Sequence, residues 1–90
     1  MEYQVLIFYK YVTIEDPQVV AGWVRSFATQ RGLTGRAIVA EEGINATFEG
    51  TRENVAAFVV GFSKDPRFAD IFFKRSVGTG QSFPKLSVKV

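Results

Sequence analysis

Cysteine and histidine are both absent from this chain of 90 residues. Without cysteine, the chain cannot form a disulfide, a zinc knuckle, an iron–sulfur cluster or a thiol nucleophile. Without histidine, it also lacks the commonest general base and a frequent ligand of zinc, copper and iron. Carboxylate chemistry and hard metals remain possible in principle, but we expect no catalytic residue, no metal site and no cofactor in this chain.

Signals for export or membrane insertion are also missing. The apolar run near the N-terminus is shorter than the roughly 20 residues that a membrane span requires. No basic segment or A-x-A-like cleavage site accompanies it. The net charge of +2 and the pI of about 9.2 are typical of ordinary solubility and identify no partner by themselves. These absences predict a cytoplasmic protein that has no membrane partner.

The chain does have enough apolar residues for one small core. The apolar fraction is 47%, with nine phenylalanines, three tyrosines and one tryptophan. A chain of this length is typical of a single domain, so we expect residues 1–90 to form one domain. The chain stops within an apolar segment that has no polar tail, which favours a fragment of a longer polypeptide.

The first third of the chain predicts a strand followed by a helix. Residues 3–11 are rich in aromatic and β-branched side chains and are apolar on both faces, which indicates a strand buried on both sides in the middle of a sheet. Asp16 can cap a helix that starts at Pro17. Apolar residues then recur at helical spacing between positions 19 and 28, and Gly32 suits the end of this helix.

The rest of the chain predicts two strands around a short turn, a second helix and two further strands. Residues 44–49 alternate between apolar and polar side chains, so we expect one wet face there. Thr51 can cap the second helix, and Pro66 is expected to end it. The other expected strands are residues 35–40, 71–76 and 86–90, with a mobile loop at 77–83.

This order of elements predicts an α+β fold of the ferredoxin-like, split βαβ kind. We expect an antiparallel sheet with two helices on one face and an extra C-terminal strand. The face without helices would then be open to solvent, and alternate residues of each strand would point to it.

Basic and aromatic residues fall on or beside several of the expected strands, and the open face could collect some of them. Such groups can bind phosphates and stack bases, although a solvated face that serves solubility is the plainer alternative. No RNP1-like run is present. The candidates for RNA binding are Lys10, Tyr11, Arg36, Arg75 and Lys85.

Two turns lack the features of a catalytic or phosphate-binding site. Glu41 and Glu42 are adjacent on the expected hairpin and would point to opposite faces, so they make a poor acid–base pair. Residues 78–80 read Gly-Thr-Gly, but no G-x-G-x-x-G or P-loop pattern surrounds them. We interpret the hairpin as a solvated turn and residues 78–80 as a flexible connection.

The order of strands and helices resembles that of the acylphosphatases, which are small enzymes with a five-stranded version of this fold. Those enzymes hold phosphate in a glycine-rich loop that contains an arginine, between the first strand and the first helix. The corresponding residues 9–17 contain no glycine and no arginine, and they end in acidic residues that would repel an anion. The resemblance therefore implies an acylphosphatase-like architecture, and we expect no acylphosphatase activity.

A closer resemblance covers nearly the whole chain. The segments that carry it read F-Y-K-Y at 8–11, I-E-D-P at 14–17, G-L-T-G-R at 32–36, A-E-E-G-I-N-A-T at 40–47, D-P-R-F at 65–68 and F-P-K-L-S-V-K at 83–89. In these segments the chain resembles the oxygen-dependent tRNA uridine hydroxylases, a bacterial family with a rhodanese-like domain and an acylphosphatase-like N-terminal domain. The A-E-E-G-I-N run, at the right distances from F-Y-K-Y and D-P-R-F, makes the resemblance fairly specific.

The resemblance implies that the whole enzyme hydroxylates the wobble uridine of certain tRNAs with molecular oxygen. It also implies that a rhodanese-like domain carries an active-loop cysteine, which this chain lacks. We therefore expect this chain to be the N-terminal accessory domain, which holds tRNA or acts as a scaffold. The contacts with tRNA would come from Lys10, Tyr11, Arg36, Arg75 and Lys85.

Another possibility is a non-catalytic protein-interaction module that docks on a neighbouring domain. Its candidate contacts lie in the hairpin, at Glu42, Gly43, Ile44 and Asn45. A free-standing enzyme of the acylphosphatase type is a third possibility. The expected partners are therefore tRNA and the rhodanese-like domain of the same polypeptide.

Overall fold

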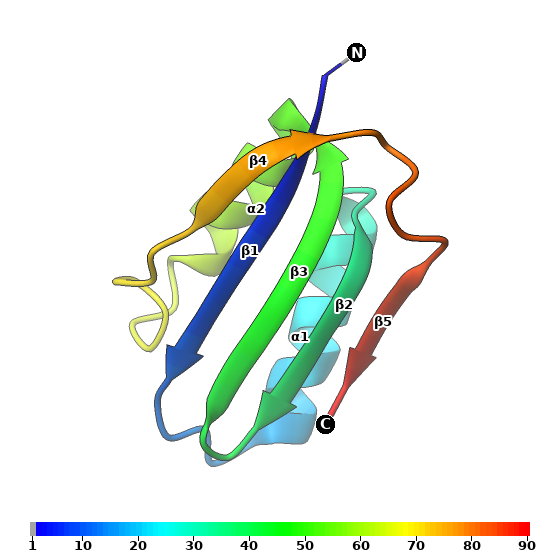
Figure 1. The fold of residues 1–90 in the computed structure, drawn as a ribbon. Coiled ribbons are helices and arrows are strands. Elements are labelled where there is room, and N and C mark those ends of the chain that lie inside the picture. The colour runs from blue at the N-terminus through cyan, green and yellow to red at the C-terminus, as the bar shows by residue number, and fades with distance from the viewer. Residues whose placement is uncertain (1) are drawn as a thin grey trace.

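The computed structural model describes residues 2–90, which form one five-stranded sheet with two helices packed on one of its faces (Figure 1). The opposite face of the sheet carries no helix. In chain order the elements are β1 (Tyr3–Tyr11), α1 (Pro17–Gln30), β2 (Thr34–Ala40), β3 (Gly43–Thr51), α2 (Arg52–Phe62), β4 (Lys74–Gly78) and β5 (Leu86–Lys89). This α+β architecture confirms the predicted fold class.

One strand runs in a direction that the sequence did not predict. The strand order is β4-β1-β3-β2-β5, and every neighbouring pair is antiparallel except β2–β5, which is parallel. The prediction of an antiparallel sheet is therefore wrong for β5. The chain leaves β4 at one edge, crosses the end of the sheet where β2 begins, and enters β5 at the other edge (Figure 1). Because β5 starts beside the start of β2, it runs in the same direction.

The two helices begin where the sequence predicts, but only one of the expected caps forms. The Thr51 hydroxyl accepts a hydrogen bond from the Asn54 N–H at 3.2 Å, which satisfies a free donor in the first turn of α2. Asp16 precedes Pro17 as expected but makes no capping bond with its side chain. Its carboxylate instead accepts from the Arg67 guanidinium at 3.1 Å, so the predicted cap is wrong.

β1 lies inside the sheet as predicted, but only one of its faces is buried. Leu6 and Phe8 point to the helices and are 0% and 2% exposed. Tyr9 and Tyr11 point the other way and are 66% and 83% exposed. Apolar side chains on both faces indicated burial on both sides, and this was wrong because both helices cover the same face.

β4 also begins later than predicted, at Lys74 rather than at residue 71. Ile71 and Phe73 precede the strand and pack against the core as irregular backbone. The ladder with β1 runs from Lys74, opposite Ile7, to Gly78, opposite Tyr3. The first two residues of the expected loop are therefore part of the strand.

The core between the helices and the sheet is a layer of aromatic rings. Phe58 and Phe62 of α2 lie 6.1 and 5.3 Å from the ring of Phe8 in β1. Phe62 also stacks on Phe68 at 4.6 Å and on Trp23 of α1 at 5.3 Å. The aromatic residues of both helices therefore pack in the core or against it.

Removing one of these rings should therefore be costly. We expect Phe58→Ala to lower the free energy of unfolding by about 3–5 kcal/mol, because it leaves a cavity among residues that cannot collapse to fill it. Urea unfolding followed by tryptophan fluorescence would measure this. Val19→Ala, at an exposed position of α1, is the control and should change stability by less than about 0.5 kcal/mol. A loss below about 1 kcal/mol for Phe58→Ala would contradict the packing described above.

Candidate functional site

The open face of the sheet is organised in rows that run across the strands. In one row, Tyr9 of β1 lies opposite Asn45 of β3, which lies opposite Ile38 of β2, and Ile38 pairs with Lys89 of β5. In the next row the corresponding residues, from β4 to β5, are Lys74, Ile7, Thr47, Arg36 and Ser87. Each row therefore brings side chains from distant parts of the sequence onto one surface.

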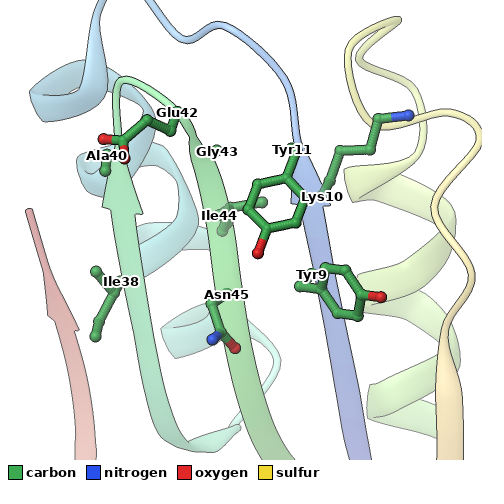
Figure 2. Close-up of a pocket in the computed structure, with 9 residues that line it drawn as sticks. All are labelled: Tyr9, Lys10, Tyr11, Ile38, Ala40, Glu42, Gly43, Ile44 and Asn45. Carbon is green, nitrogen blue, oxygen red and sulfur yellow. The ribbon is translucent and has the colours of Figure 1, made fainter.

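A depression lies on this face at the end nearest the β2–β3 hairpin, with a volume of about 400 Å³. The rings of Tyr9 and Tyr11 meet edge to face at a centroid distance of 5.8 Å. Figure 2 shows the Tyr11 hydroxyl directed towards Asn45, with Ile38 on the far side of the depression. The lining residues are Tyr9, Lys10, Tyr11, Ile38, Ala40, Glu42, Gly43, Ile44 and Asn45.

All four hairpin candidates line this depression, but they contribute in different ways. Glu42 and Asn45 are exposed and present their side chains to it. The Ile44 side chain is only 4% exposed and belongs to the core, so it cannot dock on a partner. Gly43 has φ of +151°, and a Cβ there would collide with the Lys10 carbonyl. The hairpin therefore offers two side chains, and the glycine lets it lie close to β1.

The structure brings only some of the five RNA-binding candidates together. Tyr11 and Arg36 lie on the open face. Lys85 lies just before β5, near the start of β2, where its carbonyl accepts from the Gly35 N–H at 3.0 Å, so it is close to Arg36 in the sheet but far from Tyr11. Lys10 has the same orientation as Phe8, towards the helices, and its ammonium pairs with Asp70 at 2.6 Å. This alternation of strand residues separates Lys10 from its neighbour Tyr11.

Arg75 is separated from the open face for the same reason. It lies opposite Leu6, a core residue, and therefore projects on the helix side of the edge strand β4. Lys74, its neighbour in sequence, takes the place on the open face. Tyr9, which was not among the candidates, lies on the open face next to Tyr11, as the spacing of two residues along the strand indicated.

The cations of the open face form no ion pair with an acidic residue among residues 2–90. Among residues 2–90, Lys10, Arg52 and Arg67 form ion pairs, whereas none is found for Arg36, Lys74, Lys85 and Lys89. Only one acidic residue, Glu49, lies within the five strands. The open face therefore carries uncompensated positive charge at its β4, β2 and β5 strands.

Glu49 does not counter this charge at the surface, because it is buried beneath the loop between β4 and β5. It was expected on a wet face, yet it is 1% exposed. Its Oε2 accepts from the N–H groups of Thr79 and Gly80 at 2.9 and 3.1 Å and from the Ser82 hydroxyl at 2.8 Å. Its Oε1 accepts from the Ser82 N–H at 2.9 Å. We call this arrangement the Glu49 clamp.

The Glu49 clamp keeps its carboxylate charged despite burial. Burial raises the pKa of Glu49, but the hydrogen bonds from Ser82, Gly80 and Thr79 together outweigh it, so the pKa lies below its usual value. Residues 78–80 are thus no flexible connection, which corrects the prediction. Their backbone forms a cradle for an anion, and the anion is a side chain of the same chain.

A family model described as "UPF0176 acylphosphatase like domain" matches residues 3–90. The chain belongs to this family. Relatives named tRNA uridine(34) hydroxylase are 42% identical in Staphylococcus carnosus and 43% identical in Enterococcus faecalis, over 89 residues that make up 99% of this chain. The matched region is 28% of each relative, so the chain spans little more than a quarter of their length. The predicted family resemblance is confirmed.

Solved structures support the same architecture for this UPF0176 domain. An acylphosphatase from Coxiella burnetii aligns with a TM-score of 0.67 at 15% identity, over 97% of this chain and 92% of that one. BlrB, a BLUF protein, aligns with a TM-score of 0.74 at 23% identity, over 98% of this chain and 73% of that one. At these identities the likeness shows the fold alone.

The segments that carried the family resemblance meet in space in this UPF0176 domain. F-Y-K-Y and A-E-E-G-I-N meet at the depression, where Val12 N–H donates to the Glu42 carbonyl at 3.0 Å. I-E-D-P and D-P-R-F meet where Arg67 pairs with Asp16 at 3.1 Å and with Asp65 at 2.8 Å. Hydrogen bonding by Arg67 is the main cause that lowers the pKa of Asp65. The second meeting point ties the start of α1 to the turn after α2.

Two further observations concern residues 2–90 of the UPF0176 domain. No group of three or more acidic side chains within this range is placed to hold a metal ion. None of the helices described in it is both long and apolar enough to cross a membrane.

Removing the negative charge of Glu49 should destabilise the domain by an amount that depends on pH. We expect Glu49→Gln to lower the free energy of unfolding at pH 7 by about 1.5–3 kcal/mol, because the amide cannot accept all the bonds that the carboxylate accepts. The folded pKa lies below the unfolded pKa, so the stabilisation is complete above the unfolded value of about 4.3 and is lost as pH falls through the folded value.

Urea unfolding of both proteins between pH 7 and pH 3 would test this, with Glu15→Gln, at an exposed position, as the control. The difference between wild type and Glu49→Gln should shrink as the pH falls. A difference that stays constant or grows on acidification would contradict the lowered pKa.

Proposed function

We propose that this chain is the accessory domain of a tRNA uridine hydroxylase that acts on the wobble uridine, and that it holds the tRNA. The observation that supports this most strongly is the match of 99% of the chain to relatives with that name, of which it makes up only 28%. Hydroxylation would be carried out elsewhere in the same polypeptide, by a rhodanese-like domain with a loop cysteine. A tRNA substrate would place the protein in the cytoplasm.

The open face is suited to holding RNA because of its charge. Arg36 and Lys74 lie in one row of the sheet and Lys89 lies in the next, with no ion-pair partner found among residues 2–90. Structured RNA is bound largely through its shape and its phosphates, and cations on a rigid sheet can supply such contacts at fixed spacing. The tRNA contacts proposed here are Tyr11, Arg36, Lys74, Lys85 and Lys89.

Acylphosphatase activity is not part of this proposal. Two backbone donors of the segment that would cradle a phosphate, after β1, are already engaged. Val12 N–H donates to the Glu42 carbonyl at 3.0 Å, and Ile14 N–H donates to the Glu41 carbonyl at 2.9 Å. Together with the acidic Glu15 and Asp16 that follow, this arrangement disfavours an anion.

A docking module for the neighbouring domain is the second candidate function. The observation that favours it is the exposed apolar surface of Tyr9, Tyr11 and Ile38 around the depression. Asn45 rather than Ile44 is the residue to change in a test of docking, because the Ile44 side chain is in the core. Asn45→Ala in the full-length protein should then weaken domain association and leave RNA affinity unchanged.

Titration of this chain with an anticodon stem–loop at two salt concentrations tests the proposed function. We expect binding at low salt that weakens as salt rises, because phosphate contacts release counterions. Arg36→Ala/Lys89→Ala should weaken binding and reduce the slope of log K against log salt by about 0.7–0.9 for each phosphate that the variant no longer neutralises.

The matched control is Arg52→Ala/Lys64→Ala, which removes the same charge from α2 and the turn after it. This control should leave the salt slope near that of wild type. Equal losses in the two double variants would show that the open face has no special part. No binding of the wild type at low salt would overturn the RNA-holding role and leave the family membership standing.

A further inference from the structure

Two exposed aromatic rings form one wall of the depression on the open face. Tyr9 and Tyr11 are 66% and 83% exposed, and their rings contact each other edge to face. Both belong to β1, whose backbone is paired with β3 along all nine of its residues. The rings are thus large, exposed and held on a rigid strand, which is the arrangement that stacks unpaired bases in RNA-binding sheets.

A polar side chain capable of reading a base edge lies beside these rings. Asn45 is opposite Tyr9 in the register of β1 and β3, and Figure 2 shows its amide beneath the Tyr11 hydroxyl. The Asn45 side chain is exposed and has no hydrogen-bond partner within residues 2–90. An amide offers both a donor and an acceptor, which matches the mixed edge of a nucleobase.

The charges differ on the two sides of the depression and would orient a nucleotide bound in it. Lys89 ends the row that contains Asn45 and Ile38, and Arg36 lies in the adjacent row. The opposite rim, at the hairpin, carries the exposed carboxylate of Glu42. A phosphate would therefore be attracted to the side of Arg36 and Lys89 and repelled from the hairpin.

The size of the depression is also suitable for a small ligand. Its volume of about 400 Å³ falls at the lower end of the range of small-molecule sites. Ile38 provides an apolar surface across from the tyrosine rings. A single planar group with polar edges fits between these features better than a helix or a duplex.

We propose that this depression binds one unpaired nucleobase of a single-stranded RNA loop. The base stacks on the ring of Tyr11, which the ring of Tyr9 supports from the side through their edge-to-face contact. Its polar edge faces Asn45, and its phosphates lie towards Arg36 and Lys89. This proposal rests on the proposed function, that the domain holds tRNA. It goes further, because it makes the domain a reader of unpaired nucleotides rather than a purely electrostatic support.

Two RNAs with equal numbers of phosphates distinguish a base-binding site from a charged surface. One is an anticodon stem–loop, and the other is a fully paired duplex. We expect wild type to bind the stem–loop more tightly than the duplex. Tyr11→Leu should weaken binding of the stem–loop about tenfold, as loss of one stacked base does, and leave the duplex affinity and the salt slope unchanged. Asn45→Ala should likewise affect only the stem–loop.

Two controls separate stacking from other effects. Tyr11→Phe keeps the ring and should retain most of the stem–loop affinity. Phe72→Leu alters another exposed aromatic residue outside the depression and should have no effect. Urea unfolding of each variant would verify that the fold is unchanged, as expected for exposed positions.

Several results would overturn the proposal. If wild type bound both RNAs equally and Tyr11→Leu changed neither affinity, the base-binding site would be wrong while the RNA-holding function stood. If the tyrosine variants weakened association with the rest of the full-length protein and spared RNA affinity, the depression would be a protein-docking surface. If wild type bound neither RNA at low salt, the proposed function itself would fail and this proposal with it.

Discussion

Packing of the phenylalanine layer between the two helices and the sheet is the interaction on which the rest of this structure depends. Phe62 of α2 touches rings from β1, from α1 and from the turn that follows α2. A domain of this size has room for one such layer, and both helices are used to cover it. The opposite face of the sheet therefore has no part in the main core, and its side chains are free to meet a ligand.

The Glu49 clamp determines how much of that face is available. Glu49 lies in the row of Val5 and Thr34, at the end of the sheet away from the hairpin, and the loop that holds it covers this end. Burial of the carboxylate also removes the one negative charge of the strands from the surface. The clamp thus leaves the hairpin end open and removes a negative charge from the exposed face, so electrostatics favour an anionic partner on the side of Arg36 and Lys89.

Much of the fold follows from local patterns, whereas the site depends on pairings that those patterns do not contain. Pro17 and Thr51 mark the helix starts correctly, and the strands fall near their predicted positions. The direction of β5 depends on the path of a loop, and the burial of Glu49 depends on donors about 30 residues away in sequence. Lys10 and Arg75 were expected to share a binding surface with Tyr11 and Arg36. The alternation of side chains along β1 and β4 instead directs Lys10 and Arg75 to the helix side of the sheet.

Strand pairing in this sheet also implies an order of assembly. The β2–β3 hairpin, which contributes several residues to the lining of the depression, joins neighbouring segments of the chain, whereas β4 and β5 pair with strands far away in sequence. Contacts close in sequence form with a smaller loss of loop entropy, so the hairpin is favoured to form before the edges. The edges are also the natural places for local opening in the folded state. Fraying of β4 or β5 would then leave the hairpin intact but would displace Lys74 or Lys89, so amide exchange at the edge strands would report on the same opening that removes these cations from the open face.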